Sequence, residues 1–167
     1  MTKRAICFDE LCPSVADFRN HIRLTTDALD GELQDKLMAA VRAAEHFIGK
    51  LIAPSIITYT VSFVRSLTLP EGPVIEVLGV KVDGQETSSY TRDGRVITFS
   101  DDVAGSEVEV IYKAGMEREG FEYDIRAAIL LHAAALLNNP VDSVETLPKA
   151  STNLLRPYRT WHDGDNY

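Results

Sequence analysis

The feature that most constrains this chain is a change of hydrophobic period, from helical to alternating and back to helical. Apolar residues recur every three or four positions from Leu33 to Leu51, which is the spacing of one face of an α-helix. From Ile57 to Phe63 they alternate with Thr and Ser, which is typical of a half-buried strand. Residues 123–138 are helical again. Because strands gathered between helices are typical of the α+β class, we expect helices that pack together and an inserted β unit.

Local signals set the expected boundaries of four helices, two long and two short. Ser14, Asp27 and Ser151 are expected to cap helices at their starts, and Gly49 is expected to end one. Asp83-Gly84 is a signal for a tight turn between antiparallel strands. We expect a single domain over 14–161, with helices at 14–24, 30–48, 123–138 and 152–158 and about five antiparallel strands within 55–113. The segments 1–13 and 162–167 are expected to be flexible.

Composition excludes several classes of protein. The 167 residues suit one domain, and the net charge is −8. An acidic chain gains little by neutralising phosphates, so sequence-specific nucleic-acid binding is not expected. The longest apolar run, Ala127–Leu137, is too short to span a bilayer. No apolar segment follows the basic N-terminus, so we expect no secretory signal and a cytoplasmic site of synthesis.

Residues that carry chemistry are scattered rather than clustered. The four histidines are isolated, and His132 could be a general base or, as we favour, a partly buried and hydrogen-bonded core residue. Asp101 and Asp102 could bind a cation, but a solvated loop is the better interpretation. Cys7 and Cys12 are too few for a structural zinc site; we expect two free thiols and leave a disulfide open. We therefore expect no enzyme activity, no catalytic residue, no cofactor and no metal.

Several short motifs occur in the order found in one protein family. They are the helix Ser14–Leu24, the loop Leu69–Val74, the strand Val108–Gly115, the helix Ala128–Ala134 and the closing Leu154–Arg159. Each motif alone is weak evidence, because most of these residues only mark where helices, strands and turns begin or end. Together, over about residues 14–161, their order and spacing resemble the head–tail connector (adaptor) proteins of long-tailed bacteriophages and prophages.

The resemblance implies a structural protein of the virion neck, the head–tail junction, made in the cytoplasm of a bacterial host. Such subunits form a ring, usually of about twelve copies, below the portal. The ring joins capsid to tail and extends the DNA channel. The implied partners are other copies of the chain, the portal protein and a stopper or tail-completion protein. DNA would pass through the lumen without sequence-specific binding, and no membrane is involved.

Two sets of residues are candidate sites within such a ring. The first combines apolar, aromatic and Arg side chains of the kind enriched at interface hot spots, and by the resemblance it would dock on the portal. The alternative is that it folds back on its own subunit. This set is Leu154, Leu155, Arg156, Pro157, Tyr158, Arg159 and Trp161. The second set is acidic, would repel phosphates, and is expected to face the lumen or its mouth. Its members are Glu76, Glu86, Asp101, Asp102 and Glu107.

Three other functions stay open. A stopper or tail-completion protein is a related possibility, although those proteins are typically β-dominated and the long helices argue against it. A protein-interaction module with no viral role is the second. The third is an enzyme on an unfamiliar scaffold, for which Tyr123, Asp124 and His132 are the nearby candidates.

Overall fold

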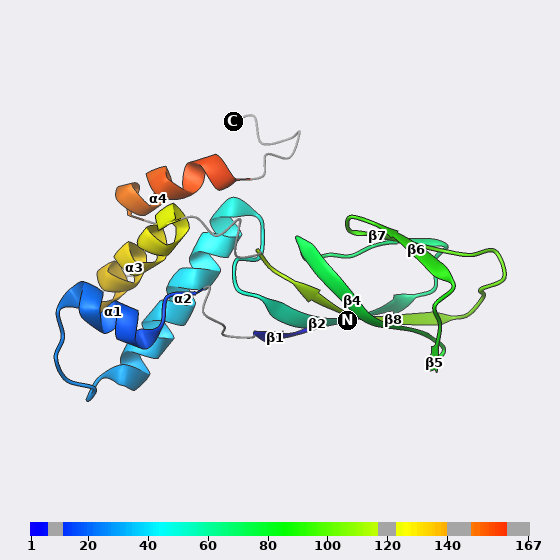
Figure 1. The fold of residues 1–167 in the computed structure, drawn as a ribbon, viewed down its shortest axis with the longest axis horizontal. Coiled ribbons are helices and arrows are strands. Elements are labelled where there is room, and N and C mark those ends of the chain that lie inside the picture. The colour runs from blue at the N-terminus through cyan, green and yellow to red at the C-terminus, as the bar shows by residue number, and fades with distance from the viewer. Residues whose placement is uncertain (7–11, 117–122, 140–147, 160–167) are drawn as a thin grey trace. The chain divides into compact units, whose positions relative to one another are not determined.

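A computed structural model describes residues 1–6, 12–116, 123–139 and 148–159. The α+β class is confirmed, with four α-helices and antiparallel sheets (Figure 1). The chain divides into two compact units. We call Met1–Phe8 with Ala53–Glu117 the β unit, and Asp9–Ile52 with Arg118–Tyr167 the helical unit.

The helical unit contains α1 (Val15–Ile22), α2 (Asp30–Ile48), α3 (Tyr123–Asn138) and α4 (Lys149–Leu155), followed by the 3-10 turn η2 (Arg156–Tyr158). Helix α3 packs against α2 and α4, and α1 packs against α2. Their apolar faces form a fully buried core that includes Phe18, Leu33, Leu37, Ile48, Ile125, Ile129 and Leu155. These buried residues lie on the helix faces that the helical period of the sequence predicts to be apolar.

Helix boundaries follow the local signals in part. Ser14 and Asp17 form the reciprocal cap at the start of α1, and Gly49 ends α2 with a left-handed φ of 71°. Asp27 is not the cap of α2, because the helix begins after Leu29 with no side-chain cap. Ser151 is not a cap either. It lies inside α4, which begins at Lys149, and its hydroxyl donates to the Ala128 carbonyl at 3.0 Å, so this side chain joins two helices instead.

The β unit holds two antiparallel sheets. The larger has the strand order β1-β2-β8-β4-β5, with bounds Thr2–Ile6, Ser55–Ser62, Glu107–Ala114, Val74–Val82 and Gln85–Glu86. The smaller has the order β3-β7-β6, with bounds Ser66–Thr68, Val96–Phe99 and Tyr90–Asp93. Hydrophobic side chains from both sheets are buried, among them Ile57, Leu67, Val80, Ile97, Phe99, Val108, Val110 and Tyr112.

The start of the chain differs from the expectation. Residues 2–6 were expected to be flexible, but β1 pairs with β2 over its whole length, from Thr2 opposite Tyr59 to Ile6 opposite Ser55. A strand whose partner lies so far along the chain leaves no local pattern, which explains the error. Residues 7–11 and the expected tail 162–167 lie outside the described residues.

Candidate interaction surfaces

One end of the β unit is built from three loops that are linked by hydrogen bonds. We call residues 62–66, 82–86 and 100–107 the β tip. The Asp83 carboxylate accepts the backbone N–H groups of Ser106, at 3.0 Å, and Glu107, at 2.9 Å. The N–H of Phe63 donates to the Ser106 carbonyl at 2.8 Å. Asp83 also has a left-handed φ of 49°, which Asp tolerates better than most residues. The β tip is therefore a defined structure rather than three independent loops.

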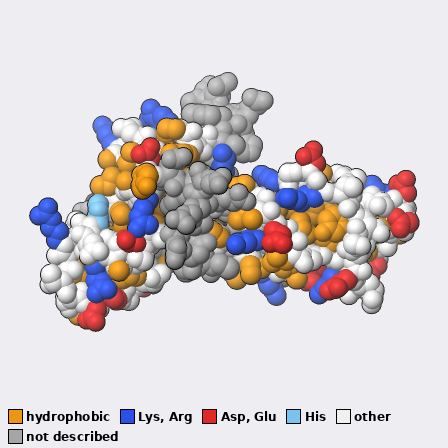
Figure 2. All heavy atoms as spheres, in the orientation of Figure 1, with side chains coloured by type: hydrophobic (Ala, Val, Ile, Leu, Met, Phe, Trp, Pro, Cys, Tyr) orange, Lys and Arg blue, Asp and Glu red, His pale blue; other side chains and the backbone are white. Residues whose placement is uncertain are grey.

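The β tip is strongly acidic. It contains five carboxylates (Asp83, Glu86, Asp101, Asp102 and Glu107) and one cation, Arg65, so its formal charge is 1 − 5 = −4. All five residues are exposed. Acidic side chains stand out at this end of the unit in Figure 2. Arg65 offsets part of the charge, because its Nη1 lies 3.4 Å from the Asp101 carboxylate.

The structure thus brings together four of the five acidic residues expected from the sequence. Glu76 does not join them, because it lies near the other end of β4, opposite Lys113 of β8. Asp83 was missed as a candidate because the sequence analysis interpreted it only as part of a tight turn. Only the fold shows that its carboxylate belongs to the same cluster.

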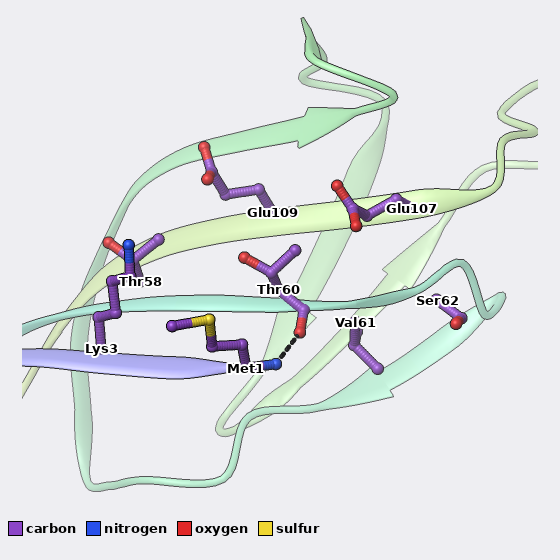
Figure 3. A pocket seen from close by; sticks show the side chains of 8 residues that line it. All are labelled: Met1, Lys3, Thr58, Thr60, Val61, Ser62, Glu107 and Glu109. Atoms are coloured by element: carbon purple, nitrogen blue, oxygen red, sulfur yellow. Dashed lines mark hydrogen bonds between the residues drawn. The ribbon is translucent and has the colours of Figure 1, made fainter.

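A shallow hollow lies on the outward face of β1, β2 and β8, beside the β tip (Figure 3). A row of hydroxyls on β2 lines it, from Thr58 to Ser62, with Lys3 on one side and Glu107 and Glu109 on the other. Glu109 is paired with Lys81, whose Nζ lies 3.5 Å from its Oε1. No histidine or cysteine lies in this lining.

The described part of the C-terminal segment lies on its own chain. Leu155 is fully buried and belongs to the core, so it is not available for docking in this conformation. The Arg159 guanidinium stacks over the Phe47 ring of α2, 5.5 Å from its centroid. Arg156 and Pro157 are exposed, and Leu154 and Tyr158 are partly exposed. Trp161 lies outside the described residues.

His132 is buried in α3 with only 4% of its surface exposed, and this burial lowers its pKa. Burial was expected, but the expected hydrogen bond is wrong for Nδ1, which has no hydrogen-bond partner within the described parts of the chain. Tyr123, at the start of the same helix, is 89% exposed. Because one side chain is enclosed and the other faces solvent, the structure does not assemble the enzyme candidate of Tyr123, Asp124 and His132.

Neither metal candidate nor thiol pair gains support from the fold. Among the described residues, no group of three or more His, Cys, Asp or Glu could hold a metal ion. Cys12 is buried, and Cys7 lies outside the described residues, so the disulfide stays open. No helix in the described ranges is both long and apolar enough to cross a membrane.

Sequence reasoning missed two arginines that bind the backbone of the segment 69–74. The Arg95 guanidinium donates to the Leu69 carbonyl, at 2.9 Å from Nε and 2.7 Å from Nη2, and to the Pro70 carbonyl at 2.6 Å. Arg92 donates to the Val74 carbonyl at 3.2 Å. The buried Tyr112 hydroxyl of β8 also accepts the Glu71 N–H at 3.4 Å, and burial raises the pKa of Tyr112. The loop is therefore held by side chains of the β6–β7 hairpin and of β8.

Comparison with known proteins gives a likeness of structure only. No protein-family model and no curated protein matches the sequence. Among the solved chains that match, three cover 97% of this chain and 96% of their own length. The first comes from the neck of an empty gene transfer agent (GTA) particle computed with C6 symmetry, with a TM-score of 0.77 and 22% identity. The second comes from the neck of a native GTA particle computed with C12 symmetry, with a TM-score of 0.74 and 21% identity.

The third chain comes from the virion of a native GTA particle, with a TM-score of 0.75 and 23% identity. The chain has the fold of proteins found in gene transfer agent particles. The resemblance to head–tail connectors that the sequence motifs indicate is thereby confirmed at the level of the fold. Because the likeness covers both units, it includes the helices and the β unit alike.

Proposed function

We propose that this chain is a structural protein of the neck of a phage-like particle, where it forms a ring that joins head to tail. The observation that carries the proposal is the likeness, over nearly the whole of both chains, to chains solved in the necks of GTA particles. The motif order of the sequence supports the same role by a separate route. In this role the protein performs no chemistry.

A ring of copies is the assembly that fits this role. The similar chains were solved in necks computed with sixfold and twelvefold symmetry, and a head-to-tail contact that closes on itself generates such a ring. We propose about twelve copies here, seated between a portal protein and a stopper or tail-completion protein. The double helix would pass through the central channel.

The acidic β tip is proposed to face the channel or its mouth. A net charge of −4 on each β tip, repeated around the ring, would repel DNA phosphates and favour passage without adhesion. Glu86, Asp101, Asp102 and Glu107 carry this proposal, with Asp83 added. Glu76 stays a weaker candidate, since it lies near the other end of β4, away from the β tip. A reconstruction with a net basic channel wall would overturn this assignment.

Portal docking is proposed for the exposed part of the C-terminal segment. Arg156 and Pro157 are accessible, and Leu154, Tyr158 and Arg159 are partly so. Trp161 completes the predicted set. The expected consequence is that Arg156→Ala weakens co-purification with a portal protein, while the exposed Arg42→Ala on α2 does not. Equal loss with both variants would contradict the assignment.

The mass of the purified protein across a concentration series, with negative-stain images of the largest species, tests the ring. A closed ring of about twelve copies with a central hole is the expected result, either alone or after mixing with a portal protein. A chain that stays monomeric in both conditions would overturn the proposal. It would favour the interaction-module alternative.

A further inference from the structure

Helix α3 has two apolar faces, and only one of them is fully buried. The buried face carries Ile125, Ala128, Ile129, His132 and Ala133. On the opposite side the residues recur at spacings of four, three, four and three, which places them in one stripe along a helix of 3.6 residues per turn. We call this the α3 stripe; it consists of Tyr123, Ala127, Leu130, Ala134 and Leu137.

The chain covers the α3 stripe only in part. Tyr123 is 89% exposed, and the other four residues are partly exposed. A helix that is apolar all round is normally buried on all sides. Asp124 and Arg126 are the charged residues of α3, and Arg126 is engaged with Asp17 of α1 at 2.6 Å. From Ala127 to Leu137 the helix has no charged residue that would keep the stripe in water.

The other long helix shows what a solvent-facing side looks like in this chain. Opposite its buried face, α2 exposes Asp35, Ala39, Arg42 and His46, which recur at the same helical spacing. Three of these four residues are polar or ionisable. The outer side of α2 is therefore polar, whereas that of α3 is apolar. This difference indicates that another molecule covers the α3 stripe.

We propose that the α3 stripe is the contact between neighbouring copies of this chain. The inference rests on the proposed function, since a ring gives every subunit a neighbour on each side. Two further features fit a second copy as the occupant. The stripe repeats at the spacing of a coiled-coil seam, and the small residues Ala127 and Ala134 let the backbone of another helix approach closely. Its lack of charge matches the core of a permanent interface rather than a transient one.

Blocking the close approach tests the contact. In Ala134→Arg, a long charged side chain replaces a methyl group at the centre of the stripe. The control is Ala39→Arg, the same exchange at an exposed position on the outer side of α2. Sedimentation velocity over a concentration series should show that Ala134→Arg weakens self-association at least about tenfold, whereas Ala39→Arg leaves it within about twofold of the unsubstituted chain. Equal assembly of both variants would overturn the inference while leaving a ring, and the proposed function, intact.

A photo-crosslinking residue at position 130 gives a second readout that does not depend on tolerance of a charge. An equal mixture of ¹⁴N- and ¹⁵N-labelled protein is irradiated, and cross-linked peptides are identified by mass. Mixed-isotope peptides, which join two copies, are expected. Products within one copy, joining position 130 to residues 140–147 or 160–167, would show that the chain covers its own stripe and would overturn the inference. Absence of any assembly, alone or with a portal protein, would overturn the inference and the proposed function together.

Discussion

The helical unit and the β unit differ in what their polar side chains hold. In the helical unit some of them join one helix to another, as in the Ser151 hydroxyl on the Ala128 carbonyl and Arg126 on Asp17, and the buried Glu45 carboxylate accepts the Ile52 N–H just beyond α2. In the β unit charged side chains bind the backbone of loops. Asp83 holds two N–H groups of the 100–107 loop, and Arg95 holds two carbonyls of the 69–73 loop.

This difference teaches where each unit is sensitive to substitution. The helices satisfy their own backbone, so their packing depends on shape and on burial of apolar surface. Loops lack that internal ladder and depend on particular donors and acceptors. We therefore expect core truncation to dominate the stability of the helical unit, and loss of single charged residues to dominate the order of the β-unit loops.

The largest effect is expected from Ile129→Ala in α3. The side chain is fully buried, so its truncation leaves a cavity and should lower the free energy of unfolding by about 2–5 kcal/mol. Chemical denaturation followed by circular dichroism measures it. The exposed Ala39→Ser, as control, should change it by less than about 0.5 kcal/mol. A loss below about 1 kcal/mol for Ile129→Ala would show that the helical core tolerates truncation. It would contradict the expectation that core packing dominates the stability of the helical unit.

Arg95→Ala should affect the β unit next most strongly. It removes the donors to Leu69 and Pro70 and should lower stability by about 1–2 kcal/mol, because exposure reduces the value of charge-assisted hydrogen bonds. Hydrogen exchange should speed up at residues 69–74 and not in α2. Arg92→Ala, whose contacts are longer at 3.2 and 3.3 Å, is the matched control and should do less. Equal exchange rates at residues 69–74 in both variants would show that Arg95 does not hold this loop.

Asp83→Ala should loosen the β tip at a cost of about 1 kcal/mol, because two backbone N–H groups lose their acceptor. Asp83→Asn keeps one side-chain oxygen and suits the left-handed φ, so it should retain most of the stability. Exchange of the Ser106 and Glu107 amides reports the change. A variant pair that behaves alike would indicate that the turn, and not the carboxylate, holds the loop.

The smallest effects are expected from pH, and they belong to the helical unit. The Asp17 pKa is lowered, chiefly by its hydrogen bond with Ser14, so its contribution is present above the ordinary value of about 3.9 and is lost as pH falls through the folded value. Burial lowers the His132 pKa in the same sense, so stability should begin to fall below about pH 6.5. Asp17→Asn and His132→Leu should each flatten the pH dependence of unfolding in its own window. An unchanged profile in either variant would contradict the assignment.

The helices were predictable because their signals are local. The period that ends at Gly49 and the Ser14–Asp17 cap can be recognised within a few residues of sequence, and the structure has both. Strand β1 was not predictable, because its partner β2 comes after both α1 and α2 in the sequence. The separate β3-β7-β6 sheet was missed for the same reason.

The candidate surfaces divide in a similar way. The acidic residues of the β tip stand out in the sequence, but only the fold brings Asp83 into the cluster and separates Glu76 from it. Arg92 and Arg95 follow no period at all. Their carbonyl partners become apparent only when the 69–74 segment and the β6–β7 hairpin meet in space.

The pairing of β1 with β2 also sets an order of events on the ribosome. Ile6 is made before α1 and α2, and Ser55, its partner, is made after them. At about 5–20 residues per second, the first strand waits on the order of seconds with its backbone unpaired. During that interval α1 and α2 emerge and can form, since their hydrogen bonds are local. Strand β1 therefore stays unpaired until β2 has been made, and a slow or stalled ribosome prolongs that exposure.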